Sequence, residues 1–388
     1  MAEWIECKIS DIGTVVGGAT PSTKKAANYE GGNIAWITPK DLSTFSGRYI
    51  QRGERNITEV GLKSCSTQLL PQNTVLFSSR APIGYVAIAA SEVCTNQGFK
   101  SVIPNKTTDP LFLFYLLKHN KDKIEGMGSG TTFKEVSGNT MKNIVVKVPV
   151  DMKIQKKIGE TLGSIDDKIE ENERINKNLL QQAQALYKDY FIDMNPFDGA
   201  MPVDWHQGTV SEIIELHDSK RIPLSSRERA DLAKVYPYYG AASIMDYVDR
   251  YLFDGIYLLL GEDGTVADSR GFPILQYVYG KFWVNNHAHI ITGKNGFSVE
   301  LLYLLFSLTS VQSIITGAVQ PKISQANLNK VPVVIPSKEE LQTLDATIQP
   351  IFAQIRNLRN ENEKLAATRD ALLPKLMSGE LDVSNLTL

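Results

Sequence analysis

Residues that could do chemistry form three short patterns in this chain of 388 residues. HDSK (217–220) and DDK (166–168) each place an aspartate two positions before a lysine, as nucleases do, but neither has an acidic partner on a preceding strand. His287 and His289 flank one residue of an expected strand, so their side chains point the same way, with no third ligand nearby. The sequence therefore predicts no catalytic residue, no metal site and no cofactor.

Two further runs could bind a phosphate or transfer a methyl group. GMGSG (126–130) has the glycine spacing of a phosphate-binding loop, but no Lys-Ser or Lys-Thr pair follows it. MNPF (194–197) is like a fragment of the motif of adenine and cytosine amino-methyltransferases, but it lacks the second proline and no glycine-rich methyl-donor loop accompanies it. We expect a structural loop and a linker at these positions.

Groups suited to binding are concentrated in loops. The run 218–234 combines basic residues with serines, and tyrosines follow in YPYYGA (236–241). TPSTKK (20–25), WITPKDL (36–42) and SSRAPIG (78–84) have a comparable composition. Such groups suit contacts to phosphates and base edges, whereas the alternative is a solvated loop followed by core tyrosines. The candidate DNA-binding residues are Lys24, Lys25, Thr38, Lys40, Arg80, Lys134, Lys220, Arg221, Ser225, Arg227, Arg229, Tyr238, Tyr239 and Lys322.

The elements that carry these loops occur twice. WIECKISDIG (4–13) matches WHQGTVSEII (205–214), and GSGTTFKEVSGNTMKNIVVKVP (128–149) matches ITGAVQPKISQANLNKVPVVIP (315–336). Each copy contains short apolar runs bounded by turns, which predict strands, and few helical patterns. We therefore expect two similar small α+β domains in which the loops carry the variable content.

Each copy is followed by a long charged helix, roughly 152–191 and 338–377. Apolar residues in both recur at alternating spacings of three and four, which is typical of a coiled-coil seam. The alternative is that each helix packs on its own domain. Asn176 and Asn362 occupy the same repeat position, where a polar residue fixes register at some cost in stability. The predicted seam residues are Ile165, Ile169, Asn172, Asn176, Leu179, Leu186, Ile351, Ile355, Leu358, Asn362, Leu365 and Leu372.

We expect the two helices to pair antiparallel within the chain, which would relate the copies by an approximate two-fold axis. Asn172 then faces Asn362. The same register sets apolar seam residues opposite one another: Ile169 with Leu365, and Leu179 with Ile355.

Composition indicates a folded protein of several domains. Hydrophobic residues make up 43% and charged residues 22%, no secretory signal opens the chain, and no apolar run is long enough to span a bilayer. Three widely spaced cysteines suggest reduced thiols, so we expect a cytoplasmic protein. The expected order is domain 1–150, spacer helix 151–194, domain 195–336 and spacer helix 337–388.

Charge is distributed unevenly between the copies. The net charge of −2 gives no overall indication of nucleic acid. Lys and Arg exceed Asp and Glu in 1–150, whereas 195–336 has an acidic excess. Any binding of DNA must therefore depend on local clusters of basic residues.

The whole chain resembles the specificity subunit of type I restriction–modification systems. The resemblance rests on the repeated order of domain and helix, on IAWITPKDL (34–42), on YPYYGA with DYVDRYLFDG (246–255), and on the closing LLPKLMSGEL (372–381). It implies a non-catalytic reader of double-stranded DNA. Each domain reads one half of a bipartite target, and an antiparallel coiled coil separates the domains.

The resemblance also implies partners. Two copies of a modification (methyltransferase) subunit dock on the coiled coil, and a restriction/translocase subunit joins the complex. The acidic second copy suggests that much phosphate neutralisation comes from the modification subunits. Two alternatives stay open: a coiled-coil adaptor that binds only proteins, and a self-sufficient DNA methyltransferase or nuclease.

Overall fold

The computed structural model describes residues 3–80, 82–130, 134–317 and 319–383. They divide into unit 1, Met1–Glu173 with Arg359–Leu388, and unit 2, Arg174–Leu358.

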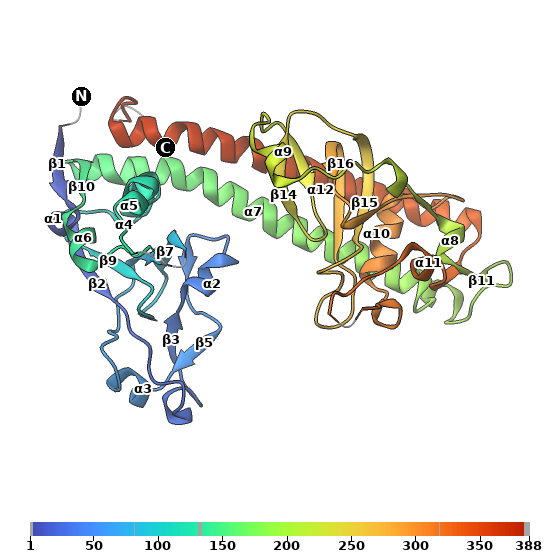
Figure 1. The fold of residues 1–388 in the computed structure, drawn as a ribbon, viewed down its shortest axis with the longest axis horizontal. Coiled ribbons are helices and arrows are strands. Elements are labelled where there is room, and N and C mark those ends of the chain that lie inside the picture. The colour runs from blue at the N-terminus through green and yellow to red at the C-terminus, as the bar shows by residue number, and fades with distance from the viewer. Residues whose placement is uncertain (1–2, 81, 131–133, 318, 384–388) are drawn as a thin grey trace. The chain divides into compact units, whose positions relative to one another are not determined.

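Two long helices contribute a stretch to each unit. They are α7 (Met152–Phe191) and α12 (Lys338–Ser378), shown in green and red in Figure 1. In the described parts of the chain, no helix is both long and apolar enough to cross a membrane.

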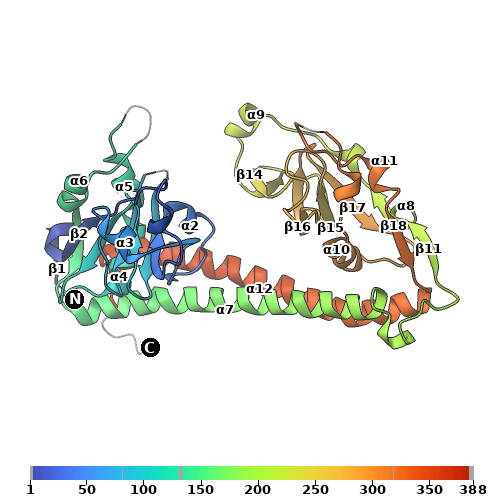
Figure 2. The ribbon, with the colours of Figure 1, turned by 90° about the horizontal axis from the view of Figure 1, so that it is seen from below.

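Unit 1 is organised around the apolar helix α4 (Pro110–His119), which lies between a sheet and α7 (Figure 2). The helix starts at a proline after Asp109, whose side chain accepts the amide of Phe112 at 2.8 Å. Residues Phe112 to Leu117 are all buried, which explains why this short helix is apolar on every side. The strand orders are β2-β9-β6-β7-β4, β5-β3-β8 and β1-β10.

The other elements of unit 1 are short. The strands are β1 (Trp4–Lys8), β2 (Gly13–Gly17), β3 (Ile34–Ile37), β4 (Tyr49–Ile50), β5 (Arg55–Ile57), β6 (Val75–Ser79), β7 (Ile83–Ala89), β8 (Cys94–Thr95), β9 (Lys100–Pro104) and β10 (Val145–Pro149). The helices are α1 (Ile9–Ile12), η1 (Ala26–Asn28), α2 (Pro39–Ser43), α3 (Glu59–Lys63), α5 (Lys121–Gly126) and α6 (Gly138–Asn143).

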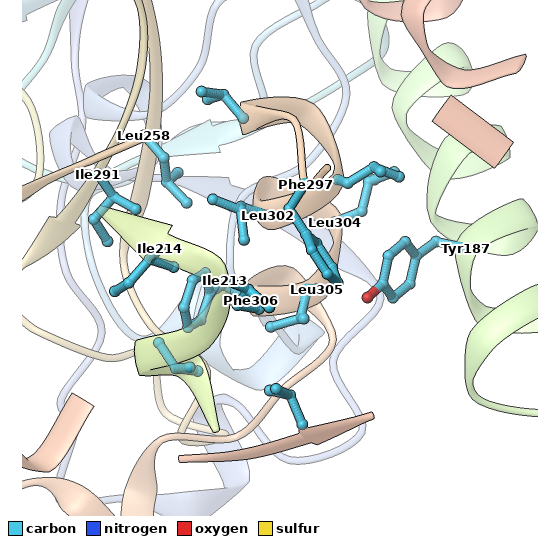
Figure 3. Close-up of a cluster of buried hydrophobic side chains, with 14 of the residues drawn as sticks. Tyr187, Ile213, Ile214, Leu258, Ile291, Phe297, Leu302, Leu304, Leu305 and Phe306 are labelled. Atoms are coloured by element: carbon cyan, nitrogen blue, oxygen red, sulfur yellow. The ribbon is translucent and has the colours of Figure 1, made fainter. Parts of the chain in front are cut away.

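Unit 2 has the same layers, with α10 (Val299–Ser307) between its sheet and the long helices (Figure 2). Figure 3 shows its core, where Leu304 and Leu305 of α10 face Tyr187 of α7, and Leu258 and Ile291 come from the sheet. The strand orders are β12-β17-β15-β16-β13-β14 and β11-β18.

The remaining elements of unit 2 include two long strands. The strands are β11 (His206–Thr209), β12 (Ile214–Leu216), β13 (Tyr236–Tyr239), β14 (Ile244–Val248), β15 (Phe253–Gly261), β16 (Leu275–Val284), β17 (Ala288–Gly293) and β18 (Pro332–Ile335). The helices are η2 (Asn195–Phe197), α8 (Val210–Ile213), η3 (Asp218–Lys220), α9 (Ser226–Ala230), η4 (Gln312–Ile314) and α11 (Gln325–Leu328).

The sequence repeat corresponds to repeated local structure. In each unit a strand near the start pairs antiparallel with the strand that precedes a long helix: β1 with β10, and β11 with β18. Asp11 and Glu212, which align in sequence, each accept the backbone amide three residues earlier, at 2.8 and 2.7 Å. Ser137 and Ser324 also align, and their side chains cap α6 and α11. Helix-capping residues therefore account for several of the matches.

Hydrogen bonds in unit 1 show that α7 and α12 run antiparallel. The amide nitrogen Nδ2 of Asn172 donates to Oδ1 of Asn362 at 2.8 Å, whereas Arg369, further along α12, reaches back to Asp166. The prediction that Asn172 faces Asn362 is confirmed. Asn172 has 0% exposure, and Nδ2 also donates to Glu361 at 2.9 Å. The side-chain oxygen of Asn176, the other expected register residue, is buried with no partner among the described residues.

The helices also pack on the globular parts, as the alternative proposed. In unit 2 the cluster around α10 includes Ala183 and Tyr187 of α7 and Leu341 of α12. The prediction that Leu186 lies in the seam is wrong, because its exposed fraction is 38% whereas that of Tyr187 is 4%. A helix with 3.6 residues per turn drifts from a 3.5-residue seam, and here the domain core decides which residue is buried.

Asp166, from the DDK pattern, is part of a buried junction rather than a catalytic centre. Its Oδ2 accepts the hydroxyl of Tyr115 and its Oδ1 accepts Arg369, both at 2.6 Å. Nearby, Arg48 of the globular part donates to the carbonyl of Gly163 at 3.1 Å. Burial and the carboxylate of Asp166 raise the pKa of Tyr115, so the phenol stays protonated as a donor.

Replacing both Asn172 and Asn362 by leucine is expected to raise the unfolding free energy, because a buried polar pair gives way to apolar contact. Asn172→Ala alone should lower it by about 1–3 kcal/mol, since the Oδ1 atom of Asn362 loses its donor. Urea unfolding measures both. A double leucine variant less stable than the wild type would contradict this account.

Candidate nucleic-acid interface

Lys24 and Lys25 project from the loop between β2 and η1. The loop is held at one end by the hydroxyl of Tyr29, which donates to the carbonyl of Pro21 at 2.7 Å. Both lysines are exposed, and neither forms an ion pair with any residue that the structure describes. Two free cations on an anchored loop suit phosphate contacts.

Thr38 and Lys40 lie at the start of α2. Thr38 is the N-cap residue, and its hydroxyl donates to Asp41 at 2.6 Å, so its side chain is engaged in shaping the helix. Lys40 pairs with Glu54 at 2.7 Å, with both side chains mostly exposed. An exposed ion pair of this kind contributes little to stability, so Lys40 can exchange Glu54 for another anion.

Arg80 and Lys134 differ in how far their charges are engaged. Glu135 accepts Arg80 at 3.1 Å and Lys100 at 3.2 Å, and both cations are partly buried. Arg80 is therefore bound within the domain. The neighbouring Lys134 is exposed and makes no ion pair with the described residues.

In the second copy, Lys220 and Arg227 differ from the other basic candidates because their charges face solvent. Both are exposed, and no ion pair to a described residue neutralises either of them. Ser225 caps α9, because its side-chain oxygen accepts the amide N–H of Glu228. The carboxylate of Glu228 in turn accepts the hydroxyl of Ser225 at 2.7 Å. The capping box fixes the short helix that presents Arg227.

Arg229 and Tyr238 are structural. Arg229 bonds Asp246 at 3.0 Å and lies over the ring of Tyr238, 4.6 Å from its centroid. Tyr238 is 1% exposed, and its hydroxyl accepts the amide of Leu224 at 3.0 Å. The alternative of a core tyrosine is right for Tyr238, because strand register directs it inward. Tyr239 is half-buried, with its ring 5.8 Å from that of Phe282.

Arg221 and Lys322 belong to a group of charges that converge on Glu262. Arg221 bonds Glu262 at 2.6 Å and Lys322 lies 3.3 Å from the same carboxylate. Arg221 also donates to the carbonyl of Ala288 at 2.7 Å and lies 3.6 Å from Asp218. Arg221 is thus engaged inside the domain, whereas the side chain of Lys322 is 49% exposed beside Glu262.

His289 completes this group. Its Nε2 lies 2.8 Å from the carbonyl of Ile323, which can only accept, and its Nδ1 lies 2.6 Å from the Asp218 carboxylate. Both ring nitrogens of this buried imidazole are therefore engaged by oxygen atoms. Burial by itself would raise the pKa of Asp218, but the hydrogen bond and charge of His289, with bonds from Ile290 and Gln325, lower it below its ordinary value.

Asp218, Glu262 and His289 bring three possible metal ligands within 4.8 Å of one another. The carboxylates already pair with cations, and both His289 nitrogens are engaged, so the residues fit an ionic clamp rather than a metal centre. His287, expected to point with His289, bonds Asp263 instead. The clamp residues Asp218, Arg221, Glu262 and His289 come from three separate segments, since Asp218 and Arg221 are neighbours, and they fix the start of the loop that carries α9.

The chain matches a known family along most of its length. The family model for the type I restriction modification DNA specificity domain matches residues 1–181 and 202–367. The specificity subunit of the type I restriction enzyme MjaIX from Methanocaldococcus jannaschii is 34% identical over 413 residues, covering 99% of this chain and 95% of that subunit. This chain belongs to the type I DNA specificity family.

Two further similarities agree with this membership. The EcoprrI specificity subunit of Escherichia coli is 22% identical, covering 94% of this chain and 91% of that subunit. The crystal structure of the type I restriction–modification S subunit from M. genitalium has a TM-score of 0.58 and 16% identity, covering 99% of this chain and 97% of that one. The predicted α+β class with two similar domains and long paired helices is confirmed.

Membership in the specificity family also decides the class of activity. The family is the DNA-recognition subunit of type I systems and is not itself catalytic. Specificity subunits bind DNA and associate with methyltransferase and restriction subunits. The absence of a convincing catalytic pattern in HDSK, DDK and MNPF is consistent with that role.

The sequence patterns did not single out Arg250, Tyr251 and Lys281 of this specificity subunit. Lys281 lies over the ring of Tyr251, and Arg250 lies over Trp283. A charged residue within the apolar strand LQYVYGKFWV was the available signal, because a lysine there must leave the core.

Asp218→Asn is expected to destabilise the protein by about 1–3 kcal/mol at neutral pH, since His289 loses its anion. The folded pKa of Asp218 lies below its ordinary 3.8, so its contribution is present above that value and is lost as pH falls through the folded pKa. Urea unfolding at neutral and acidic pH measures the difference, which should shrink in acid. Asp231→Asn, at an exposed position on the same loop, is the control. An equal difference at both pH values would contradict the clamp.

Proposed function

We propose that this chain reads a bipartite DNA target, with one half-site for the domain at 1–150 and the other for the domain at 195–336. The observation that carries the proposal is the doubled match to the specificity domain, at 1–181 and 202–367. One domain and one helix make up each copy, so the chain carries two readers of related fold and different loops.

Among the candidate residues, the exposed cations that form no ion pair with a described residue are the proposed phosphate contacts. They are Lys24, Lys25 and Lys134 in the first domain, and Lys220 and Arg227 in the second. Phosphate contacts position a domain on the duplex, and base edges are read by the loop residues beside them. Lys40 joins the set when it exchanges Glu54 for a phosphate. Arg221, Arg229 and Tyr238 support these loops from inside.

The helices 151–194 and 337–388 are the proposed spacer and dock. A helix of 40 residues measures about 60 Å, or roughly 18 base pairs of DNA. We infer that two copies of the modification subunit bind along the helix pair, and that a restriction/translocase subunit joins them. The complex works in the cytoplasm, where its DNA substrate lies.

Co-expression with the modification subunit tests the proposal. Mapping of methylated adenines by single-molecule sequencing is expected to show a split motif with a fixed gap. A contiguous motif would argue against two readers. Methylation by the purified chain alone would favour a self-sufficient methyltransferase, and assembly without sequence-dependent DNA binding would favour an adaptor.

Replacing Lys220 and Arg227 together by glutamine is expected to weaken DNA binding of the complex without changing either half-site. Each lost phosphate contact should lower the dependence of log Kd on log salt by about one. Titrations at several salt concentrations measure this slope. The matched double variant is Arg221→Gln with Arg229→Gln, which should reduce thermal stability instead because both residues are engaged internally. Equal slopes for the wild type and the first variant would contradict the assignment.

Insertion of one heptad into both α7 and α12 at facing positions is expected to lengthen the gap by about three base pairs, since seven residues add roughly 10 Å. A heptad keeps the seam in phase, so the half-sites should not change. The methylome of the complex measures the gap. Insertion in α7 alone is the control and should abolish methylation by breaking the register. Altered half-sites in the double insertion would contradict the spacer role.

A further inference from the structure

The ribbon formed by β15 and β16 contains a pair of glycines with an unusual backbone conformation. Gly255 and Gly280 face each other in the register, and both have positive φ, 135° and 81°. A Cβ at Gly280 would meet nothing within 4 Å, so the backbone conformation, not space, requires glycine there. The two strands stay paired on both sides of these glycines.

Lys281 directly follows Gly280 in β16. It is exposed, and its Nζ lies 4.7 Å from the centroid of the Tyr251 ring. Tyr251 in turn packs against Tyr236 of β13, with ring centroids 5.2 Å apart. Lys281 and Trp283 point to the same side of β16, because alternate residues of a strand share a face. An aromatic array therefore supports the lysine stem.

Arg250 extends the array. Its guanidinium carbon lies 5.7 Å from the centroid of Trp283, and its side chain is 63% exposed. Trp283 is itself fixed, because its indole N–H donates to the carbonyl of Ile222 at 2.6 Å. We call Tyr236, Arg250, Tyr251, Lys281 and Trp283 the Lys281 face.

The charges of the Lys281 face are available to a ligand. Lys281 makes no ion pair within the described part of the chain, although Asp254 lies opposite it in the register. Among the described residues, Arg250 forms an ion pair only with the adjacent Asp249, at 3.6 Å. The domain as a whole has an acidic excess, so a pair of cations set on aromatic rings indicates selection for an anionic partner.

We propose that the Lys281 face contacts the phosphate backbone of DNA held by the second domain, with Lys281 and Arg250 as positioning residues. This inference rests on the proposed function. Because the Lys281 ammonium already lies over the Tyr251 ring, the lysine side chain loses less conformational entropy when it binds a phosphate. Phosphate contacts carry no sequence information directly, so these residues set affinity and orientation, not the target sequence.

Lys281→Gln tests the proposal in the complete complex with the modification subunit. Removal of one phosphate contact should lower the salt slope, the dependence of log Kd on log salt concentration, by about one. Binding of DNA at 0.1 M salt should weaken roughly five- to tenfold, and the methylated sequence should not change. Lys281→Arg should restore most of the slope. Lys294→Gln is the matched control, because Lys294 is also exposed, lies just after β17 and makes no ion pair with a described residue.

Three results would overturn the proposal. An unchanged slope for Lys281→Gln, or an equal loss for Lys294→Gln, would show that the Lys281 face does not contact phosphate. Weaker assembly with the modification subunit in the absence of DNA, at an unchanged slope, would assign the face to a protein contact. Failure of the wild-type complex to bind or methylate any sequence selectively would instead overturn the proposed function. Thermal melting of each variant checks that the domain is folded.

Discussion

Both globular parts depend on the two long helices, because neither closes its apolar core without them. In unit 1, Ile158 of α7 and Leu376 of α12 belong to the same buried cluster as α4. In unit 2, Tyr187 of α7 and Phe352 of α12 join the cluster around α10. A slip of one residue along a helix rotates its buried side by about 100°. The register of α7 against α12 is therefore a condition for both cores, and the Asn172–Asn362 bond is placed where it can enforce that register.

In each unit a buried carboxylate lies where the globular part meets the long helices, but the two carboxylates come from different elements. In unit 1 the buried carboxylate, Asp166, comes from α7, but the equivalent position of the second copy is Phe352. Unit 2 uses Glu300 of α10, which accepts the hydroxyl of Tyr277 at 2.6 Å and Arg356 of α12 at 3.0 Å. A carboxylate buried alone would be costly, so tyrosine and arginine partners are needed in either arrangement. Duplication preserved the chemistry of the junction and let its source change.

Features that depend on local periodicity could be predicted from the sequence, whereas features that depend on register could not. Spacings of three and four follow from helix geometry, and they were enough to predict that Asn172 faces Asn362. The run YPYYG contains three tyrosines, and only the pairing of β13 with β16 decides that Tyr238 points inward. The lysine within the apolar run LQYVYGKFWV was a signal for Lys281, but the positive φ of the preceding Gly280 could not be predicted, because the sequence shows only a glycine there. The ionic clamp joins segments far apart in the chain, and no spacing reveals it.

In the second domain, buried charged residues hold the fold together, whereas exposed ones are open to solvent. Asp218 and Arg221 are enclosed and satisfied, so exchanging either one disturbs the fold. Lys220 and Arg227 lie close to them in sequence but outside the clamp, exposed to solvent. A loop anchored in this way can change its exposed residues without loss of its anchor, because surface substitutions cost little stability. That separation allows the exposed residues of the loop to change while the buried contacts that hold the loop in place stay the same.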